Sequence, residues 1–347
     1  MEAFSTGDRF TDRGLSHRRA RVPGWIRSCF RVALVLATCV TAAESEAAEA
    51  ARGPAAFKPN DVIVFTGGAN AVAAQDNGYL ELLITLGLPD LHLRFRNLAW
   101  EGDTVYEQRR DLNFGPWSRQ FERIGATVIF AQFGQMESLG GQTLLPGFVA
   151  AYDQLLDQFS KQTERLILIS PVPFQKSVPP LPDLSTRNGD LERFVKAIRQ
   201  IALRRGCRFV DVFDPLRHPE TDAGPTVHGV ELTAQGHWSV ARETARQLGL
   251  EAPSGFVQFD STTGRVSPPL AEQLRQRILA KNRLWFDYWR PMNWAFLAGD
   301  RTEQPSSRDH RDPKVRWFPG ELEKFVPLIE AKEREIAELA NRIGKAE

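Results

Sequence analysis

The sequence has few cysteines, no excess of charge of either sign and no long apolar run. Its 347 residues include 44 Lys and Arg against 43 Asp and Glu, a net charge of +1, whereas a nucleic-acid-binding domain normally carries a basic excess. No apolar run reaches the roughly 18–20 residues that a membrane-spanning helix needs. The 42% hydrophobic and 25% charged residues are ordinary for a folded chain. We therefore expect no nucleic-acid partner, no stable membrane span and no extensive disorder.

The first 50 residues resemble an export signal and leader. Arginines are scattered up to Arg31, the uncharged stretch Val32–Ala43 follows, and the next residues are small ones that offer A-x-A-like cleavage sites. A short buried helix or a single membrane anchor is the alternative, although the stretch is short for spanning. We predict cleavage between Ala43 and Ala50 and a secreted or periplasmic protein.

Cysteine use is consistent with this expectation. Cys29 and Cys39 lie within the predicted signal, so Cys207 is the only cysteine of the predicted mature chain, which then has no intramolecular disulfide. Cys207 directly precedes a strand-like run. We interpret it as a small buried hydrophobic residue rather than as a nucleophile.

Strand-like and helix-like segments alternate between residues 61 and 248. The expected strands are 61–66, 91–98, 126–133, 165–170 and 208–212, and the expected helices are 78–87, 116–124, 145–159, 190–205 and 233–248. Repeated units of this kind predict a three-layer α/β/α sandwich with a parallel sheet. Ligands of such sheets bind at the carboxyl ends of the strands. The segments expected there are 66–70, 99–104, 133–138, 170–175 and 214–231.

The last hundred residues differ in character. We expect helices over 268–289 and 321–343, separated by an irregular segment rich in Pro, Arg and Asp. The segment has too few apolar positions for a core of its own, so we expect it to pack on the α/β domain, with Arg290 and Arg301 binding carbonyls or carboxylates there. Its aromatic residues are interpreted as packing residues, with a sugar-stacking platform as the alternative. The predicted organisation is a signal peptide and leader (1–50), an α/β domain (51–250) and a C-terminal helical and irregular extension (251–347).

Four segments at the predicted strand ends resemble the sequence blocks of the SGNH, or GDSL-type, hydrolases. They are FTGGAN (65–70), NLAWEGDTV (97–105), FGQMES (133–138) and HGVELTAQGHW (228–238). Their order, and further similarity in 77–83, 169–174 and 288–301, extends the resemblance over about residues 60–340, closest to a secreted subgroup. The resemblance implies a flavodoxin-like sheet, no cofactor, and a hydrolase that acts on ester bonds, most often acyl groups on carbohydrate or lipid.

In that family a first-block serine attacks the ester, a glycine and an asparagine donate hydrogen bonds to the oxyanion, and an Asp-x-x-His pair supplies the base. The matching positions here are Gly67 and Ala69 in the first block, Gly102 in the second, Gly134 and Met136 in the third, and His228 and Glu231 in the last. The glycines match. The serine is replaced by alanine, the asparagine by methionine, the aspartate by histidine and the histidine by glutamate.

These replacements remove most of the chemistry that the resemblance implies. A methyl group cannot attack a carbonyl, and a thioether cannot donate a hydrogen bond to an oxyanion. Glu231 could accept a proton, but a carboxylate with a pKa of about 4.3 is a weak base at neutral pH. His228 and Glu231 are therefore the remaining catalytic candidates in a site that has lost the serine mechanism.

Two other catalytic arrangements are possible with the residue types present. Ser138 with His228 could form a displaced nucleophile and base; Thr66, Thr104 and His237 are the other nearby hydroxyls and histidine. A metal could use His and carboxylate ligands from the strand-end loops. The candidates are Glu101, Asp103, Glu137, His228 and Glu231. This spacing is unspecific, and hydrogen-bonded loop residues together with a helix cap at Thr233 account for it more simply, so no metal is expected.

Three functional hypotheses follow. The first is a secreted SGNH-like protein without the serine esterase mechanism that keeps a cleft for a small-molecule, glycan or acyl-ester ligand. The second is an active carbohydrate or lipid acyl esterase with a relocated nucleophile. The third is a non-catalytic interaction module. Fold similarity cannot choose among them, because function depends on the residues of the site.

Overall fold

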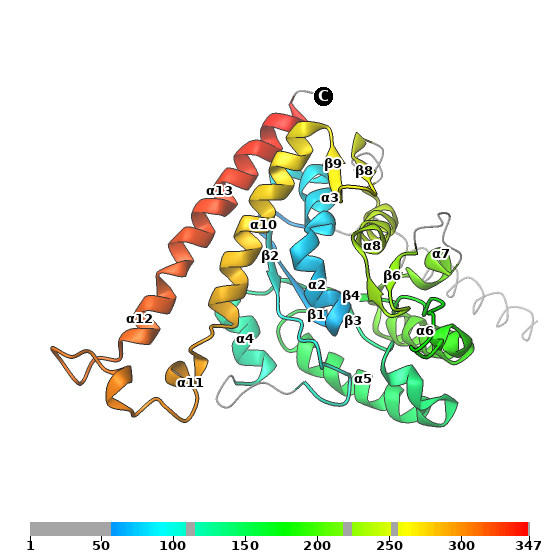
Figure 1. Ribbon diagram of the computed structural model, residues 1–347, viewed down its shortest axis with the longest axis horizontal. Coiled ribbons are helices and arrows are strands. Elements are labelled where there is room, and N and C mark those ends of the chain that lie inside the picture. Colours follow the sequence, from blue (N-terminus) through cyan, green and yellow to red (C-terminus); the bar gives the residue numbers. More distant parts are fainter. Residues whose placement is uncertain (1–56, 109–114, 218–223, 251–255, 346–347) are drawn as a thin grey trace, which may run out of the picture. The chain divides into compact units, whose positions relative to one another are not determined.

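Five parallel strands form the central sheet of the computed structural model, which describes residues 57–108, 115–217, 224–250 and 256–345 (Figure 1). They are β1 (Val62–Gly67), β2 (Arg94–Asn97), β3 (Val128–Gln132), β4 (Leu166–Ile169) and β5 (Arg208–Val210). Their spatial order is β2-β1-β3-β4-β5, the flavodoxin-like order. β1, β3 and β4 are almost wholly buried apolar runs, as expected for strands covered on both faces. The predicted α/β/α sandwich is confirmed; the predicted signal peptide and leader lie outside the described residues.

Helices cover both faces of the sheet. They are α2 (Ala69–Asn77), α3 (Tyr79–Gly87), α4 (Trp117–Ile124), α5 (Leu145–Ser160), α6 (Asn188–Arg205), α7 (Phe213–Leu216) and α8 (Ala234–Gln247). One buried cluster joins α3 and α8 to the face of the sheet that carries Ile63 and Phe130. A second cluster joins α4, α5 and α6 to the face that carries Val64 and Ile129. Alternate residues of β1 and β3 therefore pack into different helical layers.

Helix α2 was not expected from the sequence, where residues 66–70 were interpreted as a loop. The chain turns into α2 directly after β1, and Gly78, with a φ of 68°, ends α2 and precedes α3. The left-handed conformation at Gly78 suits a residue without a Cβ. Thr233 caps α8 as predicted, since its side chain accepts a hydrogen bond from the N–H of Gly236 at 3.1 Å.

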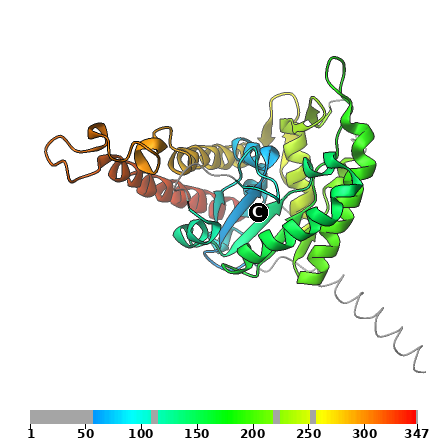
Figure 2. The ribbon, with the colours of Figure 1, turned by 90° about the horizontal axis from the view of Figure 1, so that it is seen from below.

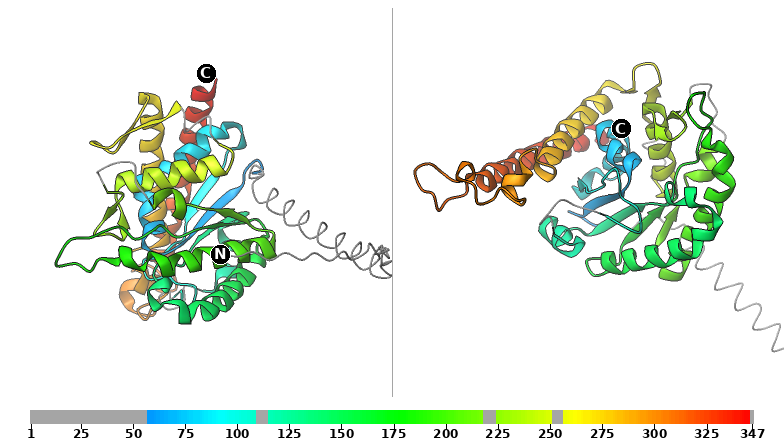
Figure 3. Two further views of the ribbon diagram at one scale, coloured as in Figure 1. Left: turned by 90° about the vertical axis from the view of Figure 1, so that its right-hand side faces the viewer. Right: turned by 60° about the horizontal axis from the view of Figure 1, so that its bottom comes forward.

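The described part of the C-terminal region contains a β-hairpin that the sequence did not predict, followed by four α-helices. The elements are β8 (Gln258–Asp260), β9 (Arg265–Ser267), α10 (Pro269–Trp289), α11 (Trp294–Leu297), α12 (Trp317–Glu323) and α13 (Phe325–Gly344). The helix expected over 321–343 is thus two helices that meet at Lys324. Figures 2 and 3 show α10 and α13, coloured yellow-orange and red, side by side. None of the described helices has the length and apolar character of a membrane span.

Side chains of α10 bind the backbone of the edge strand β2. The indole N–H of Trp285 donates to the carbonyl oxygen of Asn97 at 2.9 Å, and the ammonium of Lys281 donates to that of Phe95 at 3.4 Å. An open edge strand presents unpaired backbone groups that can pair with another chain. Helix α10 therefore covers this edge of the sheet, with Trp285 3% exposed.

Buried charges join α10 and α13 to the sheet domain. Lys281 is 1% exposed and lies 2.8 Å from the carboxylate of Glu81, and Arg96 lies 2.5 Å from that of Glu333. Burial raises the pKa of Glu81 and lowers the pKa of Lys281, while their contact opposes both shifts. Two opposite charges held this closely are costly to separate, because removal of either leaves the other unpaired in the interior.

The sequence predictions for Cys207, the C-terminal aromatic residues and the two arginines Arg290 and Arg301 are confirmed in part. Cys207 is buried and its burial raises its pKa to about 11, so it is the inert hydrophobic residue predicted. Trp289 packs in the same cluster as α4 and α5, but Trp317 is 48% exposed and does not follow the packing interpretation. Arg290 binds the Glu101 carboxylate at 2.9 Å. For Arg301 the expectation fails: its guanidinium lies over the ring of Phe296 in its own segment.

Candidate ligand cleft

A cleft of about 230 Å³ opens at the carboxyl ends of the strands. It draws residues from each of the five loops at which the sequence places ligand binding. The lining residues used below are Ala69, Asn70, Glu101, Asp103, Gln132, Gly134, Gln135, Met136, Glu137 and Glu231. Parallel topology brings these loops together, because the carboxyl ends of all five strands lie along one edge of the sheet.

The first block lines one side of the cleft. Gly67 ends β1 with a φ of 148°, and a Cβ there would lie 2.5 Å from the backbone oxygen of Gln132 on the neighbouring strand. Only glycine fits that approach. Two residues later Ala69 starts α2, after Gly68 as the N-cap, and lines the cleft. The position of the family's serine is therefore occupied by a methyl group at a helix N-terminus.

Glu137 connects the second and third blocks. One carboxylate oxygen accepts from the N–H of Val105 and the other from the N–H of Gly134, both at 2.9 Å. Glu137 is 7% exposed, and burial raises its pKa while the two backbone donors oppose the shift. Because the N–H of Gly134 is already bonded within the protein, Glu137 holds the two loops and is not a free acid or base.

The other positions of these two blocks lie at the rim. Gly102 is exposed and does not itself line the cleft, although Glu101 and Asp103 on either side of it do. Met136, at the asparagine position, lines the cleft with 53% of its surface exposed. The thioether thus stands at the mouth of the cleft and offers no hydrogen for a developing negative charge.

The last block forms a β-hairpin. β6 (Thr226–Val227) pairs with β7 (Glu231–Leu232) in antiparallel fashion, and the turn between them places His228 at a φ of 58°. His228 is exposed and lies outside the cleft lining, whereas Glu231 lines it. The structure therefore brings Ala69, Gly134, Met136 and Glu231 to one cleft and leaves His228 apart.

Asn70 has a role that the sequence did not reveal. Its amide nitrogen donates to Oε1 of Gln135 at 3.3 Å and to the carbonyl oxygen of Val230 at 3.2 Å, and its oxygen accepts from the N–H of Leu232 at 2.9 Å. One side chain thus ties the first block to the third and to the hairpin. Its place beside Ala69 in the first block was the available signal, but its partners are 65 and more than 150 residues away.

The proposed nucleophile pair of Ser138 and His228 is wrong. Ser138 is 0% exposed, its hydroxyl donates to the carbonyl oxygen of Gln135 at 2.7 Å, and it does not line the cleft. A nucleophile needs a neighbouring base and access to the substrate. Within the described part of the chain, no group of three or more His, Cys, Asp or Glu residues is arranged to hold a metal ion.

The cleft is acidic. Carboxylates of Glu101, Asp103, Glu137 and Glu231 line it, and the described lining residues include no Lys, Arg or His. Arg290 approaches from the end of α10, pairs with Glu101 and lies over the ring of Trp100 at 3.9 Å. Because like charges repel, this arrangement disfavours an anionic ligand. Carboxylate and amide oxygens instead accept hydrogen bonds from hydroxyl groups.

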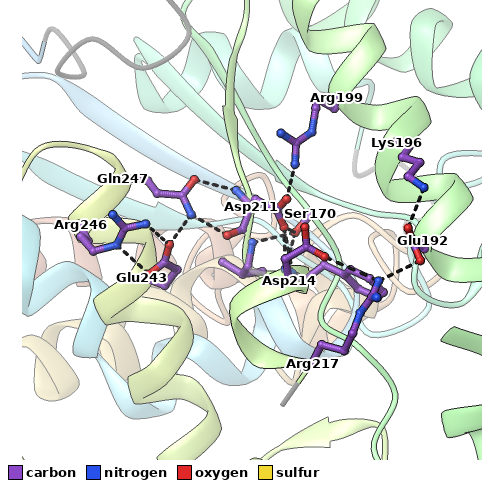
Figure 4. A network of polar contacts seen from close by, with 12 residues as sticks. Ser170, Glu192, Lys196, Arg199, Asp211, Asp214, Arg217, Glu243, Arg246 and Gln247 are labelled. Carbon is purple, nitrogen blue, oxygen red and sulfur yellow. Dashed lines mark hydrogen bonds and ion pairs between the residues drawn. The ribbon is translucent and has the colours of Figure 1, made fainter. Parts of the chain in front are cut away.

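A polar network fixes the loop after β4, which supplies Pro171 and Val172 to the cleft (Figure 4). The hydroxyl oxygen of Ser170 accepts from the N–H groups of Val212 and Phe213, at 2.8 and 2.9 Å. Asp211 pairs with Arg199, and its backbone N–H donates to Gln247 at 2.9 Å. Ser170 is thus a structural residue that joins β4 to the segment after β5.

The comparison with family models finds one match. Residues 75–238 match the model of the GDSL-like Lipase/Acylhydrolase family. Over this segment the chain is similar to the GDSL-like lipase/acylhydrolase family. The matched part of the GDSL-like domain includes the second, third and last blocks, and the first block lies just before it.

Three solved structures are similar to this chain at low sequence identity, and the first of them shares its fold. A gut microbial diltiazem-metabolizing enzyme is 12% identical, with a TM-score of 0.53 over 85% of this chain and 97% of its own. A protein from Parabacteroides merdae assigned as a GDSL-like lipase is 15% identical, with 57% and 99% covered and a TM-score of 0.47. A mutant acetyl-xylooligosaccharide esterase from Geobacillus stearothermophilus is 15% identical, with 56% and 96% covered and a TM-score of 0.43. Among curated proteins, none matches this chain.

Proposed function

We propose that this GDSL-like protein binds a neutral, hydroxyl-rich ligand such as a glycan or its acyl ester, and that it has lost the serine esterase mechanism. One observation carries the proposal: the described residues that line the cleft include no hydroxyl, thiol, imidazole or amine. Acyl transfer by the family's mechanism needs an activated hydroxyl and a base. The cleft offers a methyl group and carboxylates in their place.

The ligand class is argued from the same lining. Acidic and amide side chains such as Asp103, Gln132 and Glu231 provide acceptors for hydroxyl groups and repel phosphates and free fatty acids. Both Asn70 and Glu137 satisfy their own polar groups within the protein. The cleft is therefore held in shape before a ligand arrives, which reduces the ordering cost of binding.

Labelling with a serine-directed fluorophosphonate and assays with short acyl esters test the loss of catalysis. We expect no labelling, no turnover above background, and no gain from Ala69→Ser alone, because residues of one mechanism act together. The combination Ala69→Ser, Met136→Asn, His228→Asp and Glu231→His is the stronger test, and Asp tolerates the left-handed conformation at position 228. Stoichiometric labelling of the unmodified protein would favour the esterase with a relocated nucleophile instead.

A glycan array on the same protein tests binding. We expect retention of neutral glycans that is reduced by Glu231→Gln and by Asp103→Asn, since both remove charge from the lining without changing its shape. The matched control is Glu338→Gln, an exposed residue of α13 outside the cleft. Absence of both turnover and glycan binding would leave the non-catalytic interaction module as the remaining hypothesis.

We further propose that the protein is exported. The proposal rests on the basic segment, the uncharged stretch Val32–Ala43 and the small residues that follow. N-terminal sequencing of the mature protein is expected to place its first residue between Glu44 and Ala50. A mature chain that still contains Arg31 and Cys39 would contradict export by cleavage.

A further inference from the structure

A partly open cavity of about 70 Å³ is lined by the sheet and by the helices α2, α3 and α8. Asn70, Ala71 and Gln132 line both this cavity and the ligand cleft. The cavity is therefore adjacent to the cleft but separated from it by those three residues. Most of its wall is apolar, formed by residues such as Phe65, Ala74, Phe130, Ile169 and Ala241.

His237 lines this cavity and has an unpartnered ring nitrogen. The residue is 5% exposed, in the first turn of α8, where its backbone N–H donates to the carbonyl oxygen of Thr233 at 2.8 Å. Its Nε2 has no hydrogen-bond partner among the described residues. Burial lowers its pKa to about 4, so the ring is neutral at pH 7. A buried polar atom without a partner is costly.

Several other polar groups of the cavity wall already have partners, including Glu81, whose carboxylate accepts from the Lys281 ammonium at 2.9 Å. Thr66 donates its hydroxyl to the carbonyl oxygen of Phe130 at 2.9 Å. The amide nitrogen of Asn97 donates to the carbonyl oxygen of Ala71 at 2.7 Å, and its oxygen accepts from the N–H of Ala99 at 2.9 Å. An ordered water normally needs two to four polar partners. A mostly apolar wall with one open nitrogen suits a molecule that has one polar group and an apolar remainder.

We propose that this cavity binds a small uncharged molecule of the short-chain alcohol class, whose hydroxyl pairs with Nε2 of His237. A hydroxyl both donates and accepts, so it matches either neutral tautomer of the ring. An ion is excluded because it would lose its hydration against an apolar wall. An apolar cavity of about 150 Å³ holds benzene; by proportion, this one holds about three non-hydrogen atoms, so propan-1-ol, with four, is at the upper limit of the size that fits.

Propan-1-ol is the probe, added to the full chain at pH 7.5 with the ring nitrogens of histidine followed by ¹⁵N NMR. We expect a saturable shift of the His237 Nε2 resonance in the millimolar range, since a ligand of this size has few contacts. 1-Fluoropropane has nearly the same shape without the hydroxyl. 1-Fluoropropane should bind at least about tenfold more weakly than propan-1-ol, because the buried nitrogen then stays unpaired.

A matched pair of variants on α2 locates the site. Ala74→Leu places a larger side chain in the cavity, and Ala73→Leu makes the same change on the same helix outside the cavity lining. The saturable shift should disappear in the first variant and persist in the second. The proposal is overturned if the unmodified protein shows no saturable shift, if both alcohol and fluoroalkane bind equally, or if water alone occupies the cavity. Because the probe comparison uses the unmodified protein, poor folding of Ala74→Leu does not remove the test.

Discussion

Glu137 holds two loops of the cleft together through a single carboxylate. Each of its oxygens accepts one backbone N–H, from Val105 and from Gly134. A carboxylate can accept at both positions, whereas an amide would present its own N–H₂ group to one of these donors. The charge of Glu137 thus holds the backbone of two loops in place. A catalytic acid would also be a buried carboxylate in a cleft, so burial alone does not distinguish the two roles.

Glu137→Gln is therefore expected to lower the free energy of unfolding by about 2 kcal/mol, because one buried backbone N–H loses its charged acceptor. Chemical denaturation followed by circular dichroism measures the change. Glu231→Gln, an exposed carboxylate of the same cleft, is the matched control and should stay within about 0.5 kcal/mol of the unmodified protein. Equal effects of the two substitutions would show that Glu137 has no special structural role.

His237 should make the stability of the protein depend on pH. Its pKa is about 4 in the folded protein and 6.5 when exposed, so below pH 6.5 the unfolded chain binds a proton that the folded chain does not. The stability is therefore complete above pH 6.5 and decreases as the pH falls from 6.5 to about 4. A shift of this size corresponds to about 3 kcal/mol.

The measurement is the free energy of unfolding at several pH values, compared between the unmodified protein and His237→Gln. Other titrating groups are common to both proteins and cancel in the difference. The free energy of unfolding of the unmodified protein minus that of the variant should decrease as the pH is lowered from 6.5 to about 4. A constant difference across pH 7 to 4 would mean that the pKa of His237 is the same in the folded and the unfolded protein.

At the scale of elements, α10 is an integral part of the sheet domain rather than a peripheral extension. Lys281 and Glu81 form a buried pair between α10 and α3, and Trp285 binds the backbone of β2. We expect Lys281→Met to cost about 3–5 kcal/mol, since it leaves Glu81 charged and unpaired. The double variant with Glu81→Leu should recover most of that loss in the same denaturation assay. No recovery would assign the loss to packing rather than to charge.

Deletion of residues 270–347 should have a larger effect than any single substitution. It uncovers the edge of β2 and the apolar faces that α10 and α13 bury, and open edges of this kind aggregate. We expect insoluble protein, or a soluble form that binds a hydrophobic dye and lacks near-ultraviolet circular dichroism. A cooperative melt of a truncated chain comprising residues 51–250 would show that the C-terminal region is dispensable for the fold.

The sequence predicts the elements whose own residues determine them and misses those that depend on partners. β3 and β4 are continuous apolar runs, so their burial and parallel pairing could be predicted. Helix α2 has hardly any amphipathic character, and β8 and β9 have three residues each, so their periodicity carries no signal. The break at Lys324 lies within a charged amphipathic pattern that continues through it.

The cleft was also predicted only in part, because some of its features depend on contacts between segments that are distant in the sequence. The parallel topology places Ala69, Gly134 and Glu231 at one end of the sheet, and the resemblance in sequence identified these positions. The outward turn at His228 depends on the hairpin of β6 and β7. The bridges of Asn70 join segments more than 150 residues apart, and no local pattern encodes such a contact.

At the scale of the whole molecule, the α/β domain and the C-terminal helices share their cores. Trp285 and Trp289 of α10 lie in one buried cluster with Phe121 of α4 and Phe159 of α5. Elements that share a core unfold together. We therefore expect melts followed by tryptophan fluorescence and by far-ultraviolet circular dichroism to coincide. Two separated transitions would instead show that the C-terminal helices unfold as an independent unit.

The cover over β2 also has a consequence for the time course of synthesis. Trp285 follows its partner Asn97 by 188 residues. At a translation rate of about 5–20 residues per second, roughly ten to forty seconds pass between the appearance of the two residues. During that interval the nascent chain holds β2 without the helix that covers it, and the open strand is free to pair with other chains. The growing polypeptide is thus most vulnerable to aggregation before α10 emerges from the ribosome.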